Sequence, residues 1–326
     1  MWGMDDRELG AKIRSSLRVV LASHASHRRR KCTESEHQRF SRVGDIVYGL
    51  SQFRKSRLGT SLEYGAFRAY AGIPRHISRE TTHPKALVFG HQKTGTSVVA
   101  SVVAQQAQVG CSIDLPAERL RPSDPSRVSV ETLLRRSAPF SYRTLVKEPH
   151  WSLFAPRILE ELPDVLAVGV LRDPVKTIES ICYRLRIPTE TLNARPEVGP
   201  WWQPMIDGHG LASPSHSALE NLAARIALCE ERLSKALLEF PDRMRVVNYE
   251  DFVVSPVSAA RSLVHFFGWE ATSEADVERQ YQPGLRAASA KERERYQLKD
   301  TQREIVNQIA NRESVLANVS GFPSGE

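Results

Sequence analysis

Several features that would assign this chain to a familiar class are missing from its sequence. No apolar run approaches the roughly 18 to 20 residues of a membrane-spanning helix, and residues 1–31 lack the apolar core of a signal peptide. The four cysteines stand far apart without a Cys-x-x-Cys pair, which argues against a zinc cluster and against a disulfide framework. No internal repeat or low-complexity tract interrupts the chain. We therefore expect a soluble, cytoplasmic protein with reduced thiols.

The composition is that of a globular protein with a substantial interior. Hydrophobic residues make up 41% of the 326 residues and charged residues 25%, which excludes a mainly disordered, collagen-like or coiled-coil chain. This length is at the upper edge of what a single hydrophobic core serves. One large domain with an appendage is the first expectation.

Positive charge is concentrated at the N-terminal end of the chain. Residues 1–84 contain 16 Lys and Arg against 8 Asp and Glu, whereas the remainder contains 29 against 30. Apolar residues at helical spacing over 9–21 and 40–53 predict two amphipathic helices, so residues 1–84 read as a basic helical extension packed on or tethered to the body. Such an extension could meet an anionic membrane or an acidic carrier, and we expect no nucleic-acid partner.

From residue 85 onward, short apolar strands alternate with helical segments. This alternation predicts an α/β domain over 85–326, with a central parallel sheet flanked by helices. The predicted strands cover residues 86–90, 144–146, 165–171 and 245–248. The predicted helices cover 97–109, 158–162, 218–240 and 257–267, and a further helix begins at Pro174, a residue suited to the first helical position.

Residues 187–217 interrupt the alternation with five prolines, paired tryptophans and several glycines. A long irregular insertion in an α/β domain is often a lid or a binding loop. The pair Trp201 and Trp202 favours a lid or acceptor-binding insertion, with the tryptophans either forming a hydrophobic wall or anchoring the loop.

The strongest local motif is the run from Gly90 to Ser97, GHQKTGTS, between a predicted strand and a predicted helix. A loop in this position directs free backbone N–H groups and the positive helix end at one point, which favours a phosphate group. Gly95 lets the backbone approach a ligand, and Lys93 adds a full positive charge. The spacing also fits the P-loop of nucleotide triphosphatases, but that motif requires a lysine where Thr96 stands.

This loop resembles that of sulfotransferases that use 3′-phosphoadenosine 5′-phosphosulfate (PAPS), in which a lysine followed by Ser/Thr-Gly-Thr/Ser holds the 5′-phosphosulfate. The resemblance continues in the apolar strand, Arg172-Asp173-Pro174 and Ser180, which match the family's 3′-phosphate site, and in the Tyr-Glu-Asp segment at 249–251. It implies a P-loop-like sulfotransferase fold, PAPS as donor, no metal, and a small-molecule, lipid or glycan acceptor. The implied donor-binding residues are Gln92, Lys93, Thr94, Gly95, Thr96, Ser97, Arg172, Ser180 and, less well matched, Arg286.

The resemblance also implies catalytic residues. Lys93 is the candidate for stabilising the leaving oxygen, and Lys147 for assisting at the sulfuryl group. Many relatives have a lysine and then a histidine base separated by one residue, but here Pro149 stands at that spacing and His150 follows it. On an extended strand this shift would turn His150 away from the site. Glu148 is the competing base, and the unperturbed pKa of histidine favours His150.

Two other functional classes compete with this interpretation. A P-loop kinase would need a lysine at position 96 and an acidic magnesium ligand after a later strand, where the sequence has Arg172. A non-enzymatic basic protein would bind membrane or nucleic acid through residues 1–84 and would leave both phosphate motifs unexplained.

Overall fold

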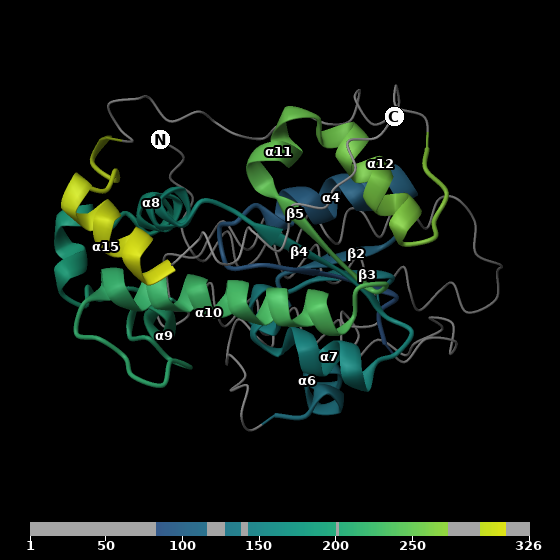
Figure 1. Ribbon diagram of the computed structural model, residues 1–326, viewed down its shortest axis with the longest axis horizontal. Helices are drawn as coiled ribbons and strands as arrows, with labels where there is room; N and C mark the ends of the chain where they lie inside the picture. The colour runs from purple at the N-terminus through teal and green to yellow at the C-terminus, as the bar shows by residue number, and fades with distance from the viewer. Residues whose placement is uncertain (1–82, 116–127, 138–142, 200–201, 273–293, 311–326) are drawn as a thin grey trace, which may run out of the picture. The chain divides into compact units, whose positions relative to one another are not determined.

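The computed structural model describes residues 83–115, 128–137, 143–199, 202–272 and 294–310, which all belong to one compact unit, Ile73–Glu326. Its centre is a five-stranded parallel sheet with the order β2-β3-β1-β4-β5 (Figure 1). The strands are β1 (Ala86–Phe89), β2 (Cys111–Ile113), β3 (Leu145–Lys147), β4 (Leu166–Leu171) and β5 (Met244–Asn248). The predicted α/β class with a central parallel sheet is confirmed, and β2 is an edge strand that the sequence pattern did not indicate.

Helices cover both faces of the sheet. On one face, α4 (Thr96–Ala107) and α12 (Pro256–Phe266) enclose an apolar cluster that includes Val88 and Val168 (Figure 1). On the other face, η2 (Pro149–Phe154), α7 (Ala155–Glu161) and α10 (Ala218–Glu239) enclose a second cluster around Phe89 and Trp151. The short α6 (Val130–Ser137) packs against α7. Burial on both faces explains why the strands read as continuous apolar runs.

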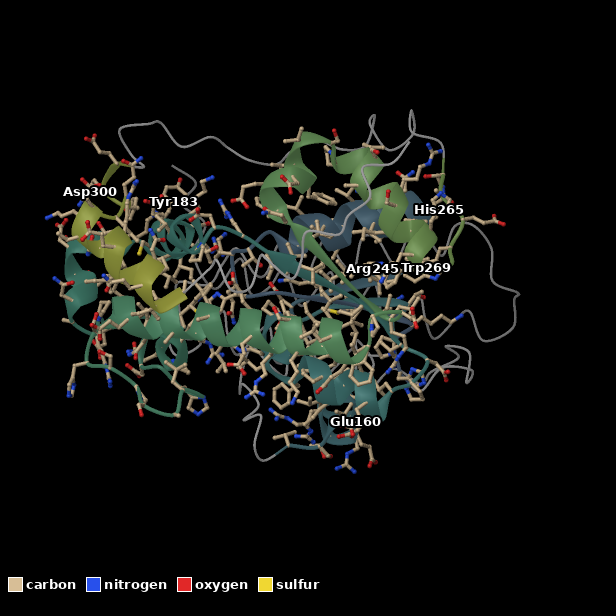
Figure 2. The ribbon with its side chains drawn as sticks, viewed as in Figure 1. Glu160, Tyr183, Arg245, His265, Trp269 and Asp300 are labelled. Atoms are coloured by element: carbon tan, nitrogen blue, oxygen red, sulfur yellow. The ribbon has the colours of Figure 1, made fainter. Side chains whose placement is uncertain are left out.

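A third apolar cluster lies beyond the sheet, between α8 (Pro174–Leu185), α10 and α15 (Asp300–Ala310). Tyr183 on α8 and Asp300 at the start of α15 mark two helices that pack together, as Figure 2 shows. The ring of Tyr183 meets that of Tyr296 edge to face, with centroids 5.5 Å apart. The helix α15 was not predicted from the sequence.

The described parts of the predicted insertion at 187–217 contribute to this third cluster. They form η3 (Thr189–Asn193) and α9 (Gln203–Ile206), and they bury Leu192, Met205 and Ile206. Trp202 packs against the same cluster, in agreement with an anchoring role, and Trp201 lies outside the described residues. The role of this segment as a lid stays a prediction.

Side-chain caps fix where the helices beside the site begin. Asp173 accepts a hydrogen bond from Lys176 N at 3.0 Å at the start of α8, with Pro174 at the first helical position as predicted. Asn248 accepts one from Glu250 N at 3.0 Å and so starts α11 (Tyr249–Val254) directly after β5. These caps hold the ends of β4 and β5 close to the loop that follows β1.

The two amphipathic helices predicted over 9–21 and 40–53 lie outside the described residues, as does the basic extension apart from His83 and Pro84. Of the helices in the described ranges, none combines the length and the apolar character needed to cross a membrane.

Candidate functional site

The loop between β1 and α4 has a backbone shape that depends on two glycines. Gly90 has φ 144° and Gly95 has φ 95°, and Lys93 between them adopts a left-handed φ of 71°. A Cβ atom at residue 95 would overlap the ring of Tyr249, so only glycine fits under that ring. The buried Thr94 hydroxyl donates to the His91 carbonyl at 2.7 Å and closes the turn. The loop is therefore held in one conformation at the start of α4.

The predicted phosphate loop has two kinds of side chain: buried ones that support the loop, and partly exposed ones that can contact a ligand. Thr94 and Thr96 are buried, whereas Gln92, Lys93 and Ser97 are partly exposed. The 12-residue helix α4 begins at Thr96. The free backbone N–H groups of its first turn therefore point back toward this loop. The loop thus combines backbone donors with the ammonium group of Lys93.

Arg172 at the carboxyl end of β4 joins the loop to α11. Its Nη1 donates to the Lys93 carbonyl at 2.8 Å, and its guanidinium group stacks 5.0 Å from the centre of the Tyr249 ring. Its Nε is buried without a hydrogen-bond partner, and the nearest carboxylate oxygen, Glu250 Oε1, is 3.9 Å away. Arg172 is thus positioned by two contacts and retains an unused N–H group.

Positive charge converges on Lys93. The pKa of Lys93 is lowered, first by burial and then by the cations Arg184, Arg172 and Lys147, against a smaller opposing effect from Asp114. Arg184 lies in the last turn of α8, which was not singled out from the sequence. Ser180 lies one turn before Arg184 on the same helix and is partly buried, so both side chains share a helix face. Lys93, Lys147 and Arg172 thus stand at or beyond the ends of three neighbouring parallel strands, and Arg184 on α8 lies within electrostatic reach of Lys93.

The acidic residues near this point are held by neighbours. Asp114, just after β2, forms an ion pair with Lys147 at the end of β3. The carboxylate of Glu148 accepts hydrogen bonds from the backbone N–H of Leu115 at 2.7 Å and of His150 at 3.0 Å. The second bond makes Glu148 the cap of η2. With 2% exposure, Glu148 has the contacts of a structural residue that joins β2 to η2.

His150 is placed differently from the expectation for an extended strand. Strand β3 ends at Lys147, and Pro149 begins the 3₁₀ helix η2, so the alternation of side chains that would turn His150 away does not apply. The ring of His150 faces the phosphate loop, with Nε2 3.2 Å from Gln92 Nε2. Burial, followed by the charge of Arg225, lowers the pKa of His150 to about 3. Its imidazole is neutral at physiological pH, but it is a weaker base than an unperturbed histidine, so the ordinary pKa of histidine does not favour His150 as the base.

The sequence motifs did not indicate two residues that influence His150. His91 was assigned no role, yet it is 3% exposed, and burial and then Arg225 lower its pKa to about 3. Arg225 lies on the buried face of α10, where Leu222 and Cys229 precede and follow it at helical spacing. A cation within that apolar stripe was the signal that could have identified it.

The remaining predicted residue, Arg286, lies outside the described residues. Within the described ranges, no group of three or more His, Cys, Asp or Glu side chains is arranged to hold a metal ion.

Comparisons with known proteins found similar folds but no similar sequences. No family model matches the chain, and neither does any curated protein. Among solved structures, sulfotransferase STF9 from Mycobacterium avium is 15% identical with a TM-score of 0.48, and the match covers 87% of this chain and 86% of that one. STF1 from Mycobacterium tuberculosis is 15% identical with a TM-score of 0.48 and coverages of 78% and 83%. Mouse sulfotransferase SULT7A1 complexed with PAP is 12% identical with a TM-score of 0.39 and coverages of 74% and 86%.

These solved structures are sulfotransferases, which is the family that the sequence motifs resemble. At such identities and TM-scores, the likeness assigns neither substrates nor residue roles.

Proposed function

We propose that this protein is a sulfotransferase that moves the sulfuryl group of PAPS to a hydroxyl group, less favourably an amine, of an acceptor and releases adenosine 3′,5′-bisphosphate. The observation that carries the proposal is the convergence of Lys93, Lys147, Arg172 and Arg184 on the loop at the start of α4. A donor that carries both a phosphosulfate and a 3′-phosphate needs this concentration of positive charge and backbone donors.

The donor's two anionic ends would bind at two neighbouring places. Lys93, Ser97 and the first backbone N–H groups of α4 would hold the 5′-phosphosulfate. Arg172, which has a buried Nε without a partner, would hold the 3′-phosphate together with Ser180 from the next helix. Both places lie at the carboxyl ends of β1 and β4, where open α/β sheets bind ligands.

The residues around the loop have distinct chemical tasks in this proposal. The charge of Lys93 stabilises the negative charge that develops on the leaving oxygen, and Lys147 does so at the sulfuryl oxygens. His150 is the proposed base: its neutral Nε2, which accepts a hydrogen bond from Gln92, would instead accept the proton of the acceptor hydroxyl once that hydroxyl takes the place of the Gln92 amide. Glu148 caps η2 and so positions the backbone of His150, because its carboxylate is engaged by two backbone N–H groups.

The acceptor is proposed to be a small molecule, a lipid or a glycan. The basic residues 1–84 would bring the enzyme to an anionic membrane surface or an acidic carrier. Sedimentation of the full chain with anionic and with zwitterionic vesicles, at low and at high salt, tests this placement.

Calorimetric titration with adenosine 3′,5′-bisphosphate tests the donor site. We expect the purified protein to bind the bisphosphate and to bind ATP with magnesium at least about tenfold more weakly. Lys93→Ala and Arg172→Ala should each weaken bisphosphate binding by about tenfold or more, because each removes a charged contact to a phosphate. Lys235→Ala is the control of equal charge, since Lys235 is exposed on α10 and pairs with Glu239.

A preference for ATP with magnesium over the bisphosphate would contradict the sulfotransferase proposal and support a phosphotransferase. Bisphosphate binding that both site variants retain would instead show that the donor binds elsewhere on the protein.

A further inference from the structure

A buried cation lies next to the proposed base and takes no part in the donor site. Arg225 is 6% exposed, and its one hydrogen bond to the described residues runs from Nη1 to the carbonyl of His209. A guanidinium group has five N–H donors. Within the described ranges, no Asp or Glu forms an ion pair with Arg225, and burial lowers its pKa. Burying a charge without an anionic partner is costly, so an anionic ligand beside Arg225 would stabilise its charged form.

The packing of α10 on η2 brings Arg225 near the phosphate loop. Cys229 lies one turn further along α10 on the same face, and Ser152 of η2 influences the pKa of its thiol. Ser152 bonds to both the N–H and the carbonyl of Gly90, at 2.7 and 3.1 Å. This face of α10 therefore lies toward η2 and the loop after Gly90, while Nη1 of Arg225 donates to the His209 carbonyl. The charge of Arg225 accordingly acts on the rings of both His91 and His150.

His91 contributes a second unmatched polar atom at the same place. Its Nδ1 lies 3.0 Å from the Gln92 carbonyl, which can only accept, so Nδ1 carries the proton in the neutral ring. Nε2 therefore presents a lone pair, and this atom is buried without a hydrogen-bond partner. Arg225 offers donors and His91 offers an acceptor, and a ligand with a charged oxygen and a hydroxyl group would satisfy both.

We propose that Arg225 binds a carboxylate of the acceptor, so that the enzyme acts on hydroxy acids rather than on neutral alcohols. This inference rests on the proposed function, because it assigns the acceptor side of the same site. The order of the charged groups supports it: His150 is influenced by Lys147 and Asp114 as well as by Arg225 and His91. The base is thus within electrostatic reach of Lys147, assigned to the sulfuryl group, and of Arg225, assigned to the acceptor.

Matched acid and amide pairs test the proposal. The protein, saturated with adenosine 3′,5′-bisphosphate, is titrated calorimetrically with 4-hydroxybenzoate, 4-hydroxyphenylacetate and 3-hydroxybutyrate, each beside its carboxamide. We expect at least one acid to bind about tenfold or more tightly than its amide, because only the acid forms the charged pair. Arg225→Gln should abolish that preference and leave binding of the amide unchanged. Arg225→Lys should retain part of it, and Lys235→Gln on the same helix should retain all of it.

The outcomes separate this inference from the donor assignment. Acid and amide binding equally in every pair, or a preference for the acid that survives Arg225→Gln, would overturn the acceptor proposal alone. A tenfold loss of bisphosphate affinity in Arg225→Gln would also overturn it, by placing Arg225 in the donor site. If the wild-type protein fails to bind the bisphosphate, the proposed function fails. The same titrations without bisphosphate then decide whether Arg225 binds a carboxylate at all.

Discussion

At the scale of single residues, the site depends on one close approach between a glycine and an aromatic ring. Tyr249 covers Gly95, and the guanidinium group of Arg172 stacks on the same ring. The Tyr-Glu-Asp segment therefore shapes the phosphate loop through its tyrosine. The cation of Arg172 and the backbone of the loop are positioned by the same side chain.

Gly95→Ala is expected to damage the loop more than the fold. The new methyl group would overlap the Tyr249 ring, and alanine disfavours φ 95°, a combination that costs on the order of 1–3 kcal/mol. We expect bisphosphate affinity to fall at least about tenfold in calorimetric titration. Gly199→Ala is the matched control, because a Cβ atom at residue 199 meets nothing within 4 Å. Unchanged affinity in Gly95→Ala would contradict the role of this loop.

Replacing Glu148 by glutamine is expected to lower stability, whereas replacing His150 by glutamine is expected to lower transfer activity. Glu148→Gln places an amide where two backbone N–H groups need acceptors, which should lower the free energy of unfolding by about 1–3 kcal/mol. His150→Gln should leave stability and bisphosphate affinity near wild type and reduce sulfuryl transfer by about 10²- to 10⁴-fold. Urea unfolding and transfer from radiolabelled PAPS to the hydroxy acids separate the two effects. Full transfer activity in His150→Gln would exclude it as the base.

The residues of the site were predictable to the extent that each stood in a local motif. Lys93, Gly95 and Arg172 follow strands directly, and the ends of parallel strands meet at one edge of the sheet. Arg225 stands in no motif near these residues, and only the packing of α10 on η2 brings it to them. The position of His150 depended on a strand giving way to a 3₁₀ helix at Pro149, which a pattern of apolar residues does not show.

At the scale of elements, the 3₁₀ helix η2 connects the base to the sheet. Its first residues carry His150, and its buried Ser152 bonds to the N–H and the carbonyl of Gly90, just after β1. The 3₁₀ helix is thereby held to the chain at the point where the phosphate loop begins.

Removing the hydroxyl group of Ser152 tests this connection. Ser152→Ala leaves the buried N–H of Gly90 without the partner it has at 2.7 Å, which should cost about 1–3 kcal/mol of unfolding free energy. Bisphosphate affinity should fall as well, because the loop begins at Gly90. Ser262→Ala is the control, since the Ser262 hydroxyl is exposed on α12 and forms only a long bond of 3.4 Å to Ser258. Equal stability of both variants would show that Ser152 does not support the loop.

The elements that the sequence predicted are those with a long apolar pattern. Strands β1 and β4 are almost entirely buried, and α10 buries one long face, so each of them left a strong apolar pattern in the sequence. The three-residue strand β2 has an exposed Ile113 and a buried Ser112, a pattern too short and mixed to detect. Helix α15 is amphipathic but polar overall, because it packs only one side against α8 and α10.

At the scale of the whole molecule, the buried histidines connect the site to the stability of the fold. His91 and His150 each have a pKa of about 3 in the folded protein, below the 6.5 of an exposed imidazole. The unfolded chain therefore binds more protons than the folded protein between these two values. Stability is full above pH 6.5 and falls as the pH decreases toward 3, by up to about 1.4 kcal/mol per pH unit for each histidine.

Urea unfolding at pH 7.5, 6.0 and 5.0 measures this loss in a range where carboxylates still contribute little. We expect His91→Gln and His150→Gln each to flatten the dependence of the unfolding free energy on pH, because glutamine takes up no proton. His216→Gln is the matched control, since it replaces a histidine that is exposed in the fold. A single substitution should remove about half of the effect and the double substitution nearly all of it. A pH dependence of the wild-type size in the double variant would mean that neither ring has a lowered pKa in the native protein, which would contradict the buried cluster around Arg225.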